Sequence, residues 1–416
     1  MKKQINPTTK AHLVRSAFYL LLLVAFCVIP FALAQRNDDV YVTPSGGGAS
    51  TLGPWSYVSN YPGGPIKAPA VGSDGTLAYV AGGYLDQPSG STDLTYTYDP
   101  GSDTWTQKAS MVGPRYGAPG VYAANVNKFY VFGGLDQNFA LTATTQIYDV
   151  ATNTWSLGTP MPDPQGRFFA GAAYDGASGK IYVIGGDDQL GFERTNNWIF
   201  DPVTDTWDSS TALPIPIAVA GAGQTADNGK IYVMGTFNGG AGSTLNQIYD
   251  ITSNTWSSGA AIPAPNFHPA TADISGGVYL MGGGNPDVAG DSTSALRGPK
   301  GIKGLTRINV PSTSYTDVRR YDVATDTWST TPSLNHVRSY TGGTAIGNTA
   351  IVVGGYDGTI DTNTVEKSVC GAQTPTPTAT VTSSPTPTAT ATATETPRVR
   401  PTPRPYPTPF PRPTPP

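Results

Sequence analysis

One short string recurs five times along the chain and restricts its fold more than any other feature. Each copy has an aromatic residue, Asp, five further residues and Trp. The copies are YDPGSDTW at 98–105, YDVATNTW at 148–155, FDPVTDTW at 200–207, YDITSNTW at 249–256 and YDVATDTW at 321–328. Successive tryptophans are 50, 52, 49 and 72 residues apart. Self-similarity at such a period indicates stacked supersecondary units that bury their faces against one another.

A second string lies midway between these copies and ends in glycine. Its six copies are LAYVAGG ending at Gly83, KFYVFGG at Gly134, KIYVIGG at Gly186, KIYVMGT at Thr236, VYLMGGG at Gly284 and IVVGG at Gly355. The apolar run predicts a strand that is buried on both faces. The glycines allow a sharp turn or a close backbone approach.

Together the two strings predict a four-stranded antiparallel sheet in each unit. The Asp or Asn two residues before each Trp suits a hairpin with left-handed geometry, and the Trp begins a fourth strand that packs between sheets. In this order and spacing, the motifs resemble the kelch repeat, within the superfamily of propellers that includes galactose oxidase. The resemblance covers about residues 51–370 and implies an all-β, six-bladed β-propeller. The predicted repeat residues are Trp55, Trp105, Trp155, Trp207, Trp256, Trp328, Gly83, Gly134, Gly186, Gly284 and Gly355.

Trp55 has no Tyr-Asp pair before it, whereas the segment Thr364–Cys370 has no Trp after it. The N-terminal segment therefore carries a spare fourth strand, and the last unit lacks one. We expect the strand around Trp55 to pair with Thr364–Cys370 and to close the ring, which removes exposed sheet edges.

The two ends of the chain differ from its middle. Residues 1–34 combine basic residues, an apolar run and the small-residue pattern Ala32-Leu33-Ala34, which predicts a secretory signal peptide rather than an uncleaved membrane anchor. Residues 35–50 form a linker to the propeller. Residues 371–416 are mostly Pro and Thr, which predicts a disordered tail or an O-glycosylated stalk. We expect a secreted protein with no stable insertion in a membrane.

Charge and cysteine content exclude several classes. Residues 35–370 hold 17 basic and 28 acidic residues, a net charge of −11, which argues against nucleic-acid binding. After cleavage Cys370 is the sole cysteine, so no internal disulfide forms and its thiol is available to cross-link two chains. No Cys or His cluster suggests a metal site, and we expect no cofactor.

Candidate ligand-binding residues follow each Trp by 10 to 12 positions, in loops that should gather on one face. They are Lys67, Arg115, Arg167, His268 and Arg338, with Tyr116, Phe168 and Tyr340 beside them. One interpretation is a partial cationic ring that holds an anionic group by bidentate contacts. The other is that the arginines hydrogen-bond to loop carbonyls and join the blades.

The fifth unit contains an insertion between its second and third strands, within Asn285–Asp317. It carries Arg297, Lys300, Lys303 and Arg307. Such a long loop in a compact repeat is functional or disordered.

These features favour an extracellular recognition module that binds an acidic glycan or a surface protein. The resemblance also admits an alternative, a carbohydrate-active enzyme similar to bacterial kelch-like sialic acid mutarotases, but the sequence identifies no acid/base pair for it. The copper radical chemistry of the galactose-oxidase class is disfavoured, because only His268, His336 and Cys370 are available as ligands. No catalytic residue is predicted.

Overall fold

The computed structural model describes residues 50–371, except 87, 189–192, 216–220, 227, 239–240 and 286–312. Chain contacts define two units, Met1–Gln373 and Thr374–Pro416, and all described residues belong to the first. The predicted signal peptide, nearly all of the linker and nearly all of the tail therefore lie outside the described residues. Within the described range, no helix is long and apolar enough to cross a membrane.

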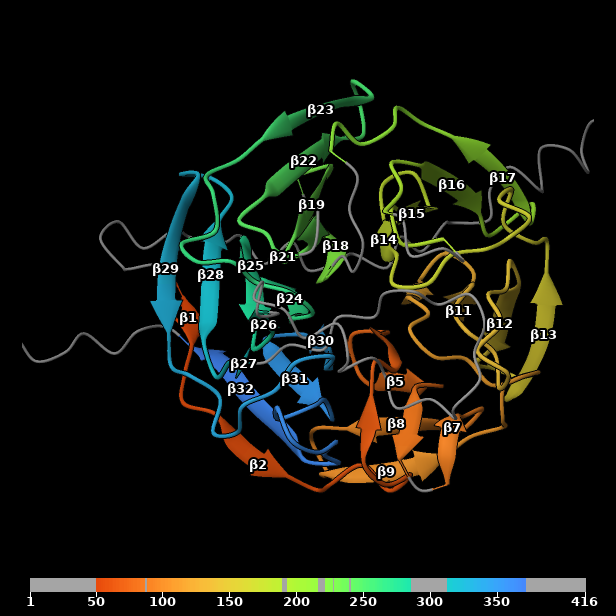
Figure 1. Ribbon diagram of the computed structural model, residues 1–416, viewed down its shortest axis with the longest axis horizontal. Helices are drawn as coiled ribbons and strands as arrows, with labels where there is room; N and C mark the ends of the chain where they lie inside the picture. Colours follow the sequence, from red (N-terminus) through yellow and green to blue (C-terminus); the bar gives the residue numbers. More distant parts are fainter. Residues whose placement is uncertain are drawn as a thin grey trace, which may run out of the picture. The chain divides into compact units, whose positions relative to one another are not determined.

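The described residues form six sheets of antiparallel strands arranged around an axis (Figure 1), which confirms the predicted all-β propeller. We call these sheets blades 1 to 6. Blade 1 is β4 (Ala70–Ser73), β5 (Ala78–Ala81), β8 (Thr95–Asp99) and β9 (Thr104–Gln107); blade 2 is β10 (Gly120–Ala123), β11 (Lys128–Phe132), β12 (Thr145–Asp149) and β13 (Thr154–Gly158); blade 3 is β14 (Gly171–Asp175), β15 (Lys180–Ile184), β16 (Asn197–Asp201) and β17 (Thr206–Ser209).

The later blades follow the same order, and the last one combines the two ends of the described chain. Blade 4 is β18 (Gly221–Ala226), β19 (Lys230–Met234), β22 (Asn246–Asp250) and β23 (Thr255–Ser258); blade 5 is β24 (Ala270–Ile274), β25 (Gly277–Met281), β28 (Val318–Asp322) and β29 (Thr327–Thr331); blade 6 is β30 (Gly342–Ile346), β31 (Thr349–Val353) and β32 (Val365–Gly371), with β1 (Thr51–Leu52) and β2 (Ser56–Val58). The first strand of each blade neighbours that of the next, and β30 returns to β4.

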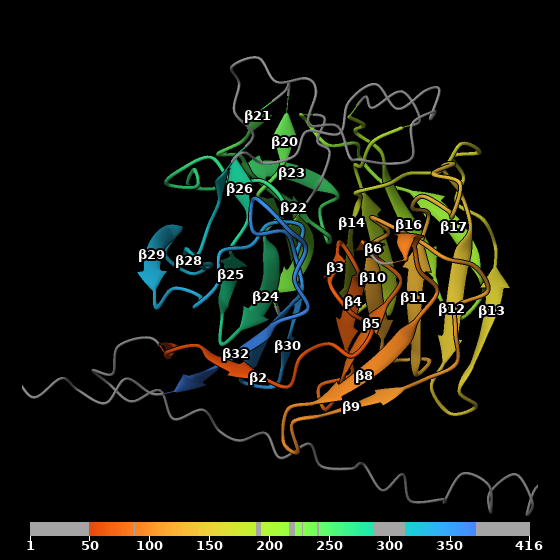
Figure 2. The same cartoon turned by 60° about the horizontal axis from the view of Figure 1, so that its bottom comes forward.

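Short strands extend the loops that link the strands of the blades. They are β3 (Ile66–Lys67), β6 (Tyr84–Asp86) and β7 (Ser89–Ser91) in one small sheet, β20 (Phe237–Asn238) with β21 (Ala241–Gly242), and β26 (Gly284–Asn285) with β27 (Thr313–Ser314). Figure 2 shows β20, β21 and β26 toward one end of the ring. This end carries the candidate site.

The repeated Trp and the Asp or Asn before it connect each blade to the one that precedes it. Asp103 has a left-handed φ of 53°, and its Oδ1 accepts hydrogen bonds from the Tyr98 hydroxyl and the Ser59 N–H, both at 2.9 Å. The indole N–H of Trp105 donates to the Ser59 carbonyl oxygen at 2.8 Å. Equivalent indole bonds join Trp155 to Ala109, Trp207 to Thr159, Trp256 to Thr211, Trp328 to Ala260 and Trp55 to Pro332. The left-handed hairpin position predicted from the sequence is confirmed, with φ of 53–55° in all five copies.

The N-terminal segment closes the ring, as predicted. In antiparallel register, Leu52 lies opposite Cys370 and Tyr57 lies opposite Glu366. The side chain of Trp55 is 6% exposed and packs in an apolar cluster with Leu52, Leu334 and Cys370. Residues from opposite ends of the described chain thus share one core between blades 5 and 6.

The glycine doublets allow the loop of the following blade to approach closely. Gly82 and Gly83 have φ of 64° and 102°, and a Cβ on Gly82 would lie 2.6 Å from the Arg115 carbonyl oxygen. In the fifth repeat the equivalent doublet is Gly282–Gly283, since Gly283 N–H donates to the Arg338 carbonyl as Gly83 N–H does to that of Arg115. The assignment of Gly284 to this position is therefore wrong by one residue; Gly284 begins β26.

Candidate ligand-binding site at one end of the central channel

The loops that enter each blade fix the alignment of the candidate residues. The carbonyls of Arg115, Arg167 and Arg338 each accept a hydrogen bond from the second residue of a glycine doublet in the preceding blade. Ile66 is the equivalent residue at the entry to blade 1, where its carbonyl accepts the N–H of Gly355. Lys67 therefore lies one residue past the arginine position. By the same comparison, Asn266 takes this position at the entry to blade 5, because its N–H bonds to Ser243 as that of Arg115 bonds to Thr92.

His268 consequently lies two residues past the arginine position. The predicted ring therefore combined three different structural positions. The loops between Trp and the next first strand differ in length, so counting from Trp misaligns them.

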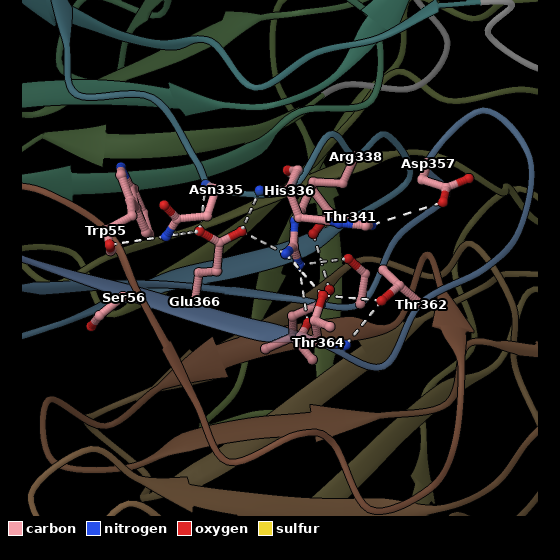
Figure 3. Close-up of polar contacts among 12 residues, drawn as sticks. Trp55, Ser56, Asn335, His336, Arg338, Thr341, Asp357, Thr362, Thr364 and Glu366 are labelled. Atoms are coloured by element: carbon pink, nitrogen blue, oxygen red, sulfur yellow. Dashed lines mark hydrogen bonds and ion pairs between the residues drawn. The ribbon is translucent and has the colours of Figure 1, made fainter.

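Arg338 joins loops within blade 6 instead of facing an open site (Figure 3). Its side chain is fully buried, and Nη2 forms an ion pair with Glu366 Oε1 at 2.7 Å. Its Nη1 donates to the carbonyls of Gly354 and Thr364, both at 3.0 Å. Burial lowers the pKa of the guanidinium, while Glu366 opposes that shift. This arginine has no group free for a ligand.

Arg115 and Arg167 have similar roles in blades 2 and 3. Arg115 Nη1 donates to the Pro114 carbonyl at 2.6 Å and Nη2 to Thr144 Oγ1 at 2.7 Å. Arg167 Nη2 donates to Asn196 and forms an ion pair with Asp163. Both arginines are more than nine-tenths buried. These contacts favour the interpretation that the arginines join loops and blades over the interpretation as an anion-binding ring.

The structure brings together a different set of side chains, two residues past the arginine position of each loop. Phe169, His268 and Tyr340 come from three blades and have left-handed φ of 53°, 53° and 52°. Positive φ is rare for large side chains and persists only where the surroundings impose it. Their rings touch, with centroids 4.5 Å apart for Phe169 and His268 and 3.6 Å for His268 and Tyr340.

These three side chains line a cavity of about 110 Å³ at the inner strands. Most other lining residues have small side chains, which leaves space for the cavity between the inner strands. They are Ala68, Pro69, Val71, Gly117, Ala118, Pro119, Gly120, Ala170, Ala172, Pro269, Ala270, Thr271, Thr341, Gly342 and Gly343.

An aromatic layer surrounds the three side chains. It contains Tyr84, Tyr116, Phe168 and Phe267 in addition to Phe169 and Tyr340. Of the predicted ligand-binding residues, His268 and Tyr340 line the cavity, and Tyr116 and Phe168 lie in the layer behind them. Tyr116 is fully buried, and its hydroxyl has no partner among the described residues.

His268 is the polar group of this layer. Burial lowers its pKa well below the usual 6.5, so the imidazole is neutral at physiological pH. Within the described part of the chain, its Nε2 has no hydrogen-bond partner. A buried polar atom without a partner costs free energy unless water or a ligand satisfies it.

Asp187 was missed by the sequence reasoning. It follows the glycine doublet of blade 3, pairs with Phe168 through the backbone and is 6% exposed. Burial, with a smaller contribution from Glu193, raises its pKa to about 8, and its charge would disfavour ionisation of Tyr340. The signal available was an Asp in a position filled by Tyr84 in blade 1 and Leu135 in blade 2.

The remaining predictions concern the insertion, Cys370 and metals. Arg297, Lys300, Lys303 and Arg307 lie outside the described residues. The Cys370 thiol is free but buried, next to Ser275, so a disulfide between two chains requires local opening. Among residues 50–371 as described, no three His, Cys, Asp or Glu side chains gather as a metal site would require.

The ring of sheets, the closing strand and the repeated Trp contacts define a kelch-type β-propeller. The chain belongs to the kelch-repeat family, since the model described as "KLHDC2/KLHL20/DRC7 Kelch-repeats domain" matches residues 68–294. No curated protein matches it. The solved structure titled "Structure of YjhT" is similar in fold, with a TM-score of 0.58, 18% identity and coverage of 74% of this chain and 95% of that chain.

Proposed function

We propose that this kelch propeller is an extracellular recognition module that binds a carbohydrate ring at the aromatic end of its central channel. The observation that carries the proposal is the convergence of Phe169, His268 and Tyr340 in left-handed backbone around one cavity. Strain of this kind concentrates at ligand-binding positions. The extracellular location rests on the predicted signal peptide.

The chemistry of the cavity supports a ligand with an apolar face and a polar edge. The rings of Phe169 and Tyr340 offer surfaces for a sugar's C–H groups, while the neutral His268 imidazole can exchange hydrogen bonds with a hydroxyl. Its unpartnered Nε2 gains a hydrogen bond on binding, whereas an apolar ligand would leave it unpaired.

The charges around the cavity favour a neutral sugar over the acidic glycan expected from the sequence. Arg338 is neutralised by Glu366, and Lys67 by Asp361 at 2.8 Å. The expectation of an acidic ligand depended on exposed arginines, whereas Arg115, Arg167 and Arg338 are buried and each binds at least one group of the fold.

A glycan array probed with the full-length chain tests the proposal. We expect binding to neutral sugars and a loss of at least about tenfold, equivalent to ~1.4 kcal/mol, in Phe169→Ala. Leu157→Ala is the matched control, because Leu157 is 56% exposed on the outer strand β13. Absence of glycan binding, together with capture of a defined surface protein that needs the same face, would overturn the carbohydrate assignment.

Asp187 favours a second candidate, a carbohydrate-active enzyme. A carboxyl group that stays protonated near neutral pH suits a general acid, and this one lies beside the aromatic layer. Turnover of a free sugar followed by NMR, abolished by Asp187→Asn, would establish catalysis. Sugar binding without turnover would exclude the enzyme and support the recognition module.

A further inference from the structure

A compact polar cluster lies between blades 6 and 1, beside the aromatic layer but outside the lining of the cavity. Lys67 Nζ is 2.8 Å from Asp361 Oδ2 and 3.1 Å from Oδ1. A second carboxylate, Asp86 Oδ1, is 3.9 Å from the same nitrogen. The side chain of Lys67 is 12% exposed and that of Asp361 only 1%. A lysine amine and an aspartate carboxyl are thus held in contact with little water.

Two tyrosine rings and a second carboxylate surround the pair. The ring centroid of Tyr84 lies 4.5 Å from Lys67 Nζ, and that of Tyr356 lies 5.8 Å away. Burial raises the pKa of Asp361 to about 6, Lys67 opposes the shift, and a hydrogen bond with Asp86 adds to it. Burial therefore makes the protonated form of the Asp361 carboxyl, the form that an amine can attack, easier to reach.

The cluster lies near the noncovalent seam of the ring, which runs within blade 6 between β32 and the N-terminal strands β1 and β2. Lys67 pairs with Tyr84, and Asp361 pairs with Tyr356, at positions that recur in other blades. At the corresponding described junctions, the two residues are Tyr116 and Ser91, Phe168 and Leu141, Phe267 and Gly242, and Ser339 and Ser314. Among these described junctions, a Lys–Asp pair occurs only at the closure.

We propose that Lys67 and Asp361 form an intramolecular amide bond that closes the propeller covalently. The three elements required are present: an amine nucleophile, a carboxyl electrophile in contact with it, and Asp86 as a neighbouring carboxylate that can move protons. Holding the two groups at 2.8 Å in a fixed orientation supplies the proximity that such a condensation needs.

The reaction balances without an oxidant or a further reactant. One proton moves from the Lys67 ammonium to the Asp361 carboxylate, which leaves a neutral amine and a protonated Asp361. The Nζ lone pair attacks Asp361 Cγ, and Asp86 accepts a proton from the nitrogen. The Cγ–O bond to one carboxyl oxygen breaks, this oxygen takes up the proton, and one water departs. The product is a Lys67 Nζ–Asp361 Cγ amide.

Mass spectrometry of the denatured full-length chain tests the proposal directly. The expected result is a peptide pair that remains joined after trypsin digestion, lighter than the sum of its two parts by one water, with no cleavage after Lys67. Fragmentation should place the bond between Lys67 and Asp361. Separate, unmodified peptides from wild-type protein would overturn the proposal and leave an ion pair only.

Two variants distinguish the bond from the contact. Lys67→Arg keeps a positive charge opposite Asp361 but lacks the nucleophilic amine, so its peptides should be separate and its mobility in a denaturing gel should resemble that of a linear chain. Asp86→Asn should retain the fold and lose most of the cross-link. Full cross-linking in Asp86→Asn would contradict the role assigned to Asp86, and a cross-link in Lys67→Arg would exclude Lys67 as the donor.

Discussion

Trp55 donates its indole N–H to the Pro332 carbonyl oxygen at 3.0 Å, across 277 positions of sequence. The same bond recurs at the five other tryptophans of the repeat, from each blade to the one before it. Trp55 therefore occupies the fourth-strand position of blade 6, although it lies at the beginning of the chain. The closing junction is built from the same contacts as the others.

Replacing Trp55 should destabilise the whole ring. Trp55→Ala removes a side chain that is 6% exposed and should lower the free energy of unfolding by ~3–5 kcal/mol, in one cooperative transition measured by chemical denaturation. Tyr57→Ala, two residues further on in β2, is the control because Tyr57 is 53% exposed; its effect should stay within ~0.5 kcal/mol. If the free energy of unfolding of Trp55→Ala were unchanged, closure of the ring by this segment would contribute nothing to stability.

Removing the negative charge of Glu366 should leave Arg338 buried and unpaired. We expect Glu366→Gln to cost ~3–5 kcal/mol of unfolding free energy. The double variant with Arg338→Met should cost less than the sum of the single changes, since the uncompensated charge is gone. For comparison, Lys128→Gln breaks a half-exposed pair with Asp149 and should cost less than ~1 kcal/mol. Additive effects of the two buried changes would contradict the pairing.

Asp187 should make stability depend on pH. Its pKa is raised in the folded protein, from 3.8 to about 8, so the folded state holds a proton that the unfolded state releases. Its contribution to stability is therefore full below pH 4, falls as pH rises to about 8, and then levels. Asp187→Asn should remove this dependence, so its advantage over wild type should grow by up to ~1.4 kcal/mol per pH unit over that range. Parallel pH profiles for the two proteins would refute the assignment.

The arrangement of strands in the blades was predictable because each sequence motif specifies a local backbone conformation. The Asp or Asn before Trp requires left-handed backbone, and all five copies show it. The phase of Trp55 against Thr364–Cys370 sufficed to predict the closing strand. These are local signals repeated many times, so an error in one copy is corrected by the others.

The site was harder to predict, because it depends on the alignment of variable loops. Arg338 is neutralised by Glu366 from a strand 28 residues away, at a position where blades 2 and 4 carry Gln146 and Gln247 bonded to loop backbone. Nothing in the spacing of Trp and Arg marks that pairing. The contact of Lys67 with Asp361 likewise requires the closed ring, which brings together residues 294 positions apart.

The central claim, a ligand bound at the aromatic end of the channel, is tested most directly at His268. The imidazole nitrogen resonances of His268 and His336 can be followed by NMR while a sugar selected on the glycan array is added. His268 Nε2 is unpartnered among the described residues and lies in the cavity wall, so its resonance should shift with saturation whereas that of His336 stays in place. A sugar that binds with measurable affinity and leaves the His268 resonances unmoved would contradict the account.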